Sequence, residues 1–231
     1  MATLNEIERN LRLIIRAGEL ADDEDISSQQ VKFMVDNTRS FLIKRDVDKN
    51  KYVDEATVQD LKCVPVELVD KAECCDITTD CYVLRTKKKI PTVIHGNFNS
   101  MLNYVGSIDG LTQFQGSTYE SVRWSQYEKY TSKLSRYYEK EGYLYVINND
   151  LLDFIRIRGV FENPREIGKF ADCAGEPCYS DDMPYPVSTS MISVINELVL
   201  TKELSVEGTS ISDERNDARN IGNQQGVGRQ S

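Results

Sequence analysis

The 231-residue sequence is poor in the residues on which most enzyme active sites depend. It contains a single histidine, His95, which stands isolated between Ile94 and Gly96. No segment combines a nucleophile with its base or supplies a paired acid. The glycines lack the spacing of a phosphate-binding loop, and no Gly-Lys-Ser/Thr follows them. We therefore predict that the protein is not an enzyme, that it has no catalytic residue and that it binds no cofactor.

Long apolar runs are missing as well. The longest, such as residues 41–43, are far shorter than the roughly 20 residues that a membrane span requires. The first residues have neither the basic start nor the apolar stretch of a signal peptide. With 40% hydrophobic and 28% charged residues, the composition is that of an ordinary soluble protein. These features predict an intracellular product with no membrane partner.

The six cysteines do not have the spacing of a zinc site. Zinc ligands usually come as two close pairs, often with histidines, and only Cys173 and Cys178 have such a spacing here. Adjacent Cys74 and Cys75 would point in different directions on a helix or on a strand. In a cytoplasm we expect all six to stay reduced and to behave as small hydrophobic residues, with no bound metal. The six are Cys63, Cys74, Cys75, Cys81, Cys173 and Cys178.

The chain carries an excess of negative charge. Its net charge is −9, and residues 1–80 hold 18 acidic against 11 basic residues, which leaves 19 against 17 for the remainder. Such a balance argues against a protein whose task is to grip nucleic acid. It is compatible with a wall that repels DNA, as the lining of a conduit would require.

Apolar residues at spacings of three and four predict helices at both ends of the chain. The first covers residues 3–17, where Thr3 and Glu6 have the spacing of a capping box. The last covers residues 188–204. The apolar stripe predicted for the first helix consists of Leu4, Ile7, Leu11 and Ile14.

Two further helices are predicted after the acidic stretch at residues 22–25. One covers residues 28–45, with Phe41 on its buried face. A shorter one begins near Asp54. Pro65 cannot continue this helix, but it can open another helical turn that runs to about Lys71.

The middle of the chain favours strands. Residues 82–86 form a strand candidate, and residues 134–147 have the pattern of a β-hairpin. In residues 154–158, two isoleucines would share one face of a strand and two arginines the other. Asn163 and Pro164 then have the spacing of a capped helix start.

Four segments carry a family resemblance: residues 63–75, 83–91, 142–145 and 158–164. Together they resemble the head–tail adaptor (ring) proteins of short-tailed, crAss-like bacteriophages. The resemblance covers roughly residues 30–170. It implies a helical bundle that carries a β-rich insertion and assembles as a dodecameric ring beneath the portal.

The predicted fold class follows the same plan. We expect an α+β protein in which the N- and C-terminal helices form a bundle around a β-rich insertion. Residues 1–80 would form one part of the bundle, residues 81–161 the insertion and residues 162–204 the helices that complete the bundle. Residues 205–231 would form a flexible C-terminal arm, because they contain too few apolar residues to order themselves.

The function that the resemblance implies is structural. The protein would be a virion component of the head–tail junction, made in the bacterial cytoplasm, with the portal above it and further ring or tail proteins below. Its ring would line the path of the genomic DNA. A generic oligomeric scaffold and a small cytosolic enzyme remain as alternatives.

Interface candidates come from four parts of the sequence, one of which is the pair of arginines in residues 154–158. The basic run at residues 87–89 is read as protection of a strand edge, as a dock for an acidic neighbouring subunit or as a DNA contact. The segment from Ser117 to Tyr130 is rich in tyrosine and serine, which suits either a partner surface or buried packing. The tail is either disordered or an arm that folds on a neighbour. The candidates are Arg85, Lys87, Lys88, Lys89, Trp124, Arg156, Arg158, Ile211, Arg215, Arg219 and Ile221.

Overall fold

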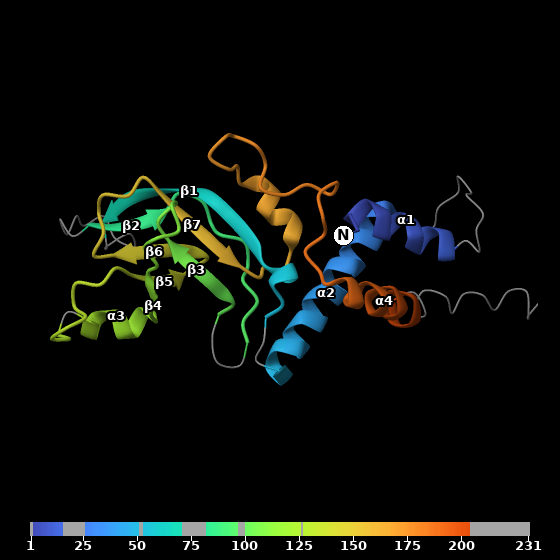
Figure 1. Cartoon of the computed structure of the whole chain (residues 1–231), viewed down its shortest axis with the longest axis horizontal. Coiled ribbons are helices and arrows are strands. Elements are labelled where there is room, and N and C mark those ends of the chain that lie inside the picture. The colour runs from blue at the N-terminus through green and yellow to red at the C-terminus, as the bar shows by residue number, and fades with distance from the viewer. Residues whose placement is uncertain are drawn as a thin grey trace, which may run out of the picture.

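The computed structural model describes residues 2–15, 26–50, 53–70, 82–96, 100–125 and 127–203. The strands gather at one end of the long axis and the helices α1, α2 and α4 at the other (Figure 1). A short stretch of irregular chain and 3-10 helix lies between the two groups.

The strands form a nearly closed barrel. One seven-stranded sheet has the order β3-β7-β1-β2-β6-β5-β4, in which only the β4–β5 pair is parallel. Its two edges approach each other, because Gly106 of β3 bridges to Gln113 and the Phe114 amide donates to the Val105 carbonyl at 2.8 Å. The strands are β1 Gln59–Asp70, β2 Tyr82–Thr86, β3 Leu102–Gly106, β4 Gln115–Gly116, β5 Arg136–Lys140, β6 Tyr143–Ile147 and β7 Phe154–Gly159.

This barrel corrects the predicted fold class. The protein is not a helical bundle with a β-rich insertion, since the seven-stranded mixed barrel is its main unit. The error originates at residues 54–71, which were predicted to be helical. Only η1, Glu55–Thr57, is helical there, and β1 follows it.

Pro65 lies within β1 and does not open a helical turn. It is the last residue of β1 to pair with β7, and Val66 is the first to pair with β2. A register shift between Leu61 and Val64 precedes it. Proline lacks a backbone N–H, so a position where a strand exchanges one partner for another tolerates it.

Most of the other predicted strands are confirmed. The hairpin is β5 and β6, joined by a tight turn in which Glu141 and Gly142 have positive φ values of 56° and 80°. In β7, Ile155 and Ile157 are fully buried while the arginines beside them are partly exposed. Asn163 caps η2, Pro164–Lys169, through its side chain and the Arg165 amide.

The terminal helices are confirmed with adjusted bounds: α1 is Leu4–Ile15, α2 is Ser28–Asn50, and α4 is Thr189–Leu198, continued by η3, Val199–Glu203. The capping box of α1 is present, since the Thr3 amide donates to Glu6 Oε2 at 2.9 Å and the Glu6 amide to Thr3 Oγ1 at 3.2 Å. Among the described helices, none combines the length and the apolar character needed to cross a membrane.

Two residues predicted to be buried are exposed. Ile14 of α1 is 54% exposed and Phe41 of α2 is 55% exposed. The apolar stripes of both helices therefore extend beyond the area that the core of the molecule covers.

One hydrophobic core joins the helices to the barrel. It contains Leu11 from α1, Val35 from α2 and Ile195 from α4, together with barrel residues such as Ile155 and Val146. A second, small cluster consists of Val83, Tyr138 and Tyr145, and the two tyrosine rings stack with centroids 5.0 Å apart.

Candidate assembly surfaces

The two arginines of β7 that were interface candidates form ion pairs within the chain. Arg156 Nε donates to Asp60 Oδ1 at 3.0 Å, and its Nη2 contacts the second oxygen of the same carboxylate. Arg158 Nη2 contacts Glu55 Oε1. These pairs join β7 to β1 and to the 3-10 turn before it, so both guanidinium groups stabilise the barrel wall.

Arg85 is similarly engaged. Its Nη2 lies 2.9 Å from Glu67 Oε1 on β1, and its guanidinium lies 4.5 Å from the centre of the Tyr143 ring. This arrangement ties β1, β2 and β6 together at one end of the barrel.

The lysines that follow β2 are exposed. Lys88 Nζ lies 6.0 Å from the centre of the Phe170 ring and Lys89 Nζ 5.6 Å from that of Tyr143. Lys87 completes the run. Lys89 and Arg85 lie against the same ring, that of Tyr143. Lys88 instead donates to the Lys169 carbonyl at 3.4 Å.

Trp124 is one of four exposed aromatic side chains between residues 119 and 130. It lies on α3, Tyr119–Ser125, and its ring centre is 6.3 Å from that of Tyr127. Trp124 is 71% exposed, Tyr127 75% and Tyr130 86%, and Tyr119 is 43% exposed. We call these four residues the aromatic surface. Its tyrosines were missed as individual candidates, although their density between residues 117 and 130 was the signal for them.

Cations lie against two of the four rings of the aromatic surface. Arg123 and Lys140 lie 5.3 and 5.2 Å from the centre of the Tyr119 ring, and Lys129 lies 5.2 Å from that of Tyr130. Such contacts hold side chains that would otherwise sample many rotamers. Tyr119 and Tyr130 therefore each have a cationic neighbour.

Two sets of hydrogen bonds fix the backbone beneath the aromatic surface. Thr118 and Ser121 cap α3 reciprocally, each amide donating to the other's hydroxyl at 3.0 and 3.2 Å. In the following turn, the nearly buried Arg136 of β5 pairs with Glu128 and donates to the Thr131 hydroxyl at 3.1 Å. The hydrogen bonds from Arg136 and Thr131 lower the pKa of Glu128 below its ordinary value.

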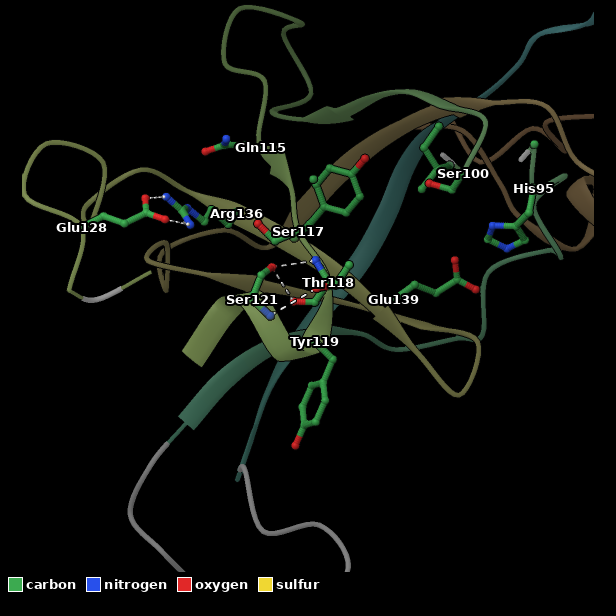
Figure 2. A pocket seen from close by; sticks show the side chains of 14 residues that line it. His95, Ser100, Gln115, Ser117, Thr118, Tyr119, Ser121, Glu128, Arg136 and Glu139 are labelled. Carbon is green, nitrogen blue, oxygen red and sulfur yellow. Dashed lines mark hydrogen bonds and ion pairs between the residues drawn. The ribbon is translucent and has the colours of Figure 1, made fainter. Parts of the chain in front are cut away.

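An open, polar hollow of about 1000 Å³ lies beside this surface. His95 and Ser100 lie on one side of it and the Glu128–Arg136 pair on the other (Figure 2). His95 and Ser100 are joined by a backbone bridge, and no hydrogen bond connects their side chains or that of Glu139 in the described part of the hollow. The hollow therefore contains no assembled nucleophile and base.

Exposed apolar side chains are also found on the three helices α1, α2 and α4. Phe33 and Phe41 are 59% and 55% exposed, and their spacing of eight residues places them on the solvent side of α2. Ile14 of α1 and Val194 of α4 are also exposed. We call these four residues the helical surface. The helices that carry it lie at the opposite end of the long axis from α3 (Figure 1).

One pair of cysteines departs from the sequence prediction. Cys63 of β1 and Cys173 form a disulfide with their Cα atoms 5.2 Å apart, so the expectation that both stay reduced is wrong. They are separated by 110 residues, and spacing along the chain gives no sign of such a pair. Cys178 is a free thiol whose pKa is raised by burial. The remaining cysteines, Cys74, Cys75 and Cys81, lie outside the described residues.

Four other candidates also lie outside the described residues. They are the tail residues Ile211, Arg215, Arg219 and Ile221. Within the described ranges, no group of three His, Cys, Asp or Glu side chains is arranged to hold a metal ion.

Comparison with known proteins gives one family. Residues 6–225 match a protein family of crAss-like phages that is described as phage tail ring protein 2. This range contains both the aromatic and the helical surface. The resemblance to crAss-like ring proteins found in the sequence is thereby confirmed. No curated protein matches the chain.

Proposed function

Because the chain belongs to the phage tail ring protein 2 family, its role is structural, and we propose that its copies form a closed ring at the head–tail junction of the virion. The family match over residues 6–225 is the observation that carries this proposal. The same reasoning assigns no catalytic step to the protein.

A closed ring places a geometric demand on the subunit. Each copy contacts its two neighbours through two different surfaces, because a ring is built from heterologous, head-to-tail contacts. The aromatic and the helical surface are two different surfaces, and they lie toward opposite ends of the long axis.

The direct test is the mass of the assembled species. Native mass spectrometry of the purified full-length protein, over a series of concentrations, should give one closed oligomer, and we propose twelve copies. A protein that stays monomeric at high concentration and is missing from purified virions would contradict the proposal.

We further propose that the ring lies between the portal and the tail and surrounds the path of the DNA. The net charge of −9 supports this position, since an acidic wall does not hold passing DNA. Electron cryomicroscopy of intact virions tests it. Density for this fold elsewhere in the particle would contradict the assigned position and leave the ring itself intact.

The basic run at residues 87–89 is proposed as a dock for an acidic neighbour. Its lysines are exposed and adjacent, unlike the arginines of β7, which are paired within the chain. Replacing all three by glutamate should weaken binding to the neighbouring tail component with a strong dependence on salt. The control is a glutamine triple variant, which removes charge without reversing it and should have the smaller effect.

The segment at residues 205–231 is proposed as an assembly arm that binds the portal. Ordering it costs roughly 1–2 kcal/mol per residue in backbone entropy, which a preformed groove on a neighbour would have to offset. A ring multiplies each weak contact through avidity. Deleting residues 205–231 should leave the melting temperature nearly unchanged and abolish attachment to the portal. A truncated protein that still joined particles normally would contradict this role.

A further inference from the structure

We propose that the aromatic surface of one copy docks on the helical surface of the next copy in the ring. This inference rests on the proposed ring function and identifies its subunit contact. The occupant of each surface is thus a second copy of this same chain.

The aromatic surface has the chemistry of an interface core. Tyrosine and tryptophan are enriched at the centres of protein interfaces, where they supply large contact areas at a low cost in side-chain entropy. Trp124, Tyr127 and Tyr130 are each more than two-thirds exposed. Scaled by their exposed fractions, four aromatic side chains that can each bury about 150–250 Å² together offer on the order of 500 Å². A standard interface buries about 800 Å² on each partner, so these residues supply most of one side.

The surface is also held in place before any partner binds. Reciprocal capping by Thr118 and Ser121 fixes the start of α3, and the Glu128–Arg136 pair fixes the turn after it. Preorganisation of this kind reduces the entropy lost on association.

The helical surface offers exposed apolar side chains to this contact. Phe33 and Phe41 present two phenyl rings on the solvent side of α2, and Lys202 Nζ lies 6.0 Å from the centre of the Phe41 ring. Aromatic rings favour edge-to-face and offset contacts with other rings, so tyrosine and tryptophan side chains suit this area. Ile14 and Val194 extend it with aliphatic groups.

The placement of the two surfaces fits a ring. They differ in composition, and they lie toward opposite ends of the long axis (Figure 1). A contact that joins opposite ends of identical copies propagates head to tail and ends only on closure.

Two double variants separate the surfaces. Trp124→Ser with Tyr130→Ser removes the aromatic contact, and Phe33→Ser with Phe41→Ser removes the helical one. Each should remain monomeric by native mass spectrometry, with a melting temperature close to that of the natural protein, because all four side chains are exposed. Leu151→Ser is the matched control, since Leu151 is 95% exposed and belongs to neither surface; it should form the ring.

Mixing the two double variants gives the decisive result. Each retains the surface that the other lacks, so an equimolar mixture should form one-to-one heterodimers and no ring. If the natural protein forms no ring, the proposed function fails; if it forms a ring and both double variants do so equally well, only the surface assignment fails. If both double variants are monomeric and their mixture gives no heterodimer, the pairing of the aromatic with the helical surface is wrong. It is also wrong if the variants still form the ring but lose binding to DNA or to another tail protein.

Discussion

Arg39 is the most deeply buried charged side chain at the joint between the helices and the barrel. Its guanidinium is inaccessible to solvent and donates to the carbonyls of Pro186 at 2.7 Å, Phe161 at 2.9 Å and Thr57 at 3.3 Å. Asp36, one turn earlier on α2, accepts hydrogen bonds from Tyr185 Oη at 2.7 Å and from Arg165 Nε at 2.9 Å. One turn of α2 thus satisfies buried polar groups from three separate segments.

We expect Arg39→Met to lower the free energy of unfolding by about 3–5 kcal/mol, because it leaves three buried carbonyls without donors and leaves Asp36 with Arg165 as its remaining cationic partner. Arg39→Lys should recover only part of this loss, since an ammonium group cannot reproduce the planar fork of donors. Chemical denaturation measures both. Arg45→Met on the exposed side of the same helix is the control, and an equal loss there would contradict the assignment.

Glu128 gives a prediction that depends on pH. Its pKa is lowered by the hydrogen bonds from Arg136 and Thr131, so the folded state favours the charged carboxylate. A lowered pKa stabilises the fold above the unfolded-state value of 4.5, and this stabilisation is lost as the pH falls through the folded-state pKa. The stability advantage of the natural protein over Glu128→Gln should therefore be largest near neutral pH and should disappear in acid. The free energy of unfolding of both proteins, measured from neutral to acidic pH, tests this prediction. A stability advantage that grew in acid would contradict a lowered pKa for Glu128.

At the scale of elements, local patterns were predictable and long-range partners were not. The capping box of α1 and the β5–β6 hairpin depend on residues within a few positions of each other, and spacing alone indicated both. Strand β1 depends on Asp60 pairing with Arg156, 96 residues away, and on the Cys63–Cys173 disulfide. Its apolar residues at short spacings fit a helix or a bulged strand equally well, and only the distant strands decide between them.

The same limit applies to the assembly surfaces. Periodicity placed Ile14 and Phe41 on apolar stripes, but it could not show that the core ends before reaching them. The density of tyrosines near Trp124 indicated a partner surface or buried packing, and three of these side chains are exposed and not packed in the core. Sequence therefore identified apolar positions correctly and could not assign them to core or surface.

Closure of the barrel depends on Gly106 at the end of β3. A Cβ atom there would fall against the Thr112 carbonyl oxygen and 2.7 Å from Tyr104 Cζ, and the Tyr104 hydroxyl is itself fixed by hydrogen bonds to Ser107 and Thr112. We expect Gly106→Ala to lower the free energy of unfolding by about 1–3 kcal/mol, because backbone must move to admit the methyl group.

Gly116 of β4 provides the matched control for Gly106. A Cβ atom at Gly116 would lie 3.1 Å from Tyr137 Oη, the far end of a side chain that can rotate away. Gly116→Ala should cost less than Gly106→Ala in chemical denaturation. Equal losses in the free energy of unfolding for the two variants would mean that barrel closure does not depend on the close approach of β3 to Thr112.

At the scale of the whole molecule, the helices and the barrel share one core, and this continuity has a consequence for ring assembly. The helical surface lies on elements whose inner faces pack into the same cluster as the barrel residues, so the two proposed contact surfaces are held at a fixed separation. A ring built from subunits with a rigid span closes at one copy number, whereas a hinge between the two ends would permit several.

The last prediction tests this continuity through Leu11→Ala. Leu11 of α1 is fully buried in the shared core, so its truncation should lower the free energy of unfolding by about 2–5 kcal/mol. If the core is cooperative, far-ultraviolet circular dichroism of the helices and near-ultraviolet signals of the barrel tyrosines should follow one transition, and Leu11→Ala should shift both together. Ile14→Ala, three residues further along the same helix but 54% exposed, should shift neither by more than about 0.5 kcal/mol. Two separate transitions, with only the helical one shifted by Leu11→Ala, would show that the helices can detach from the barrel, and the fixed span on which a single ring size depends would be lost.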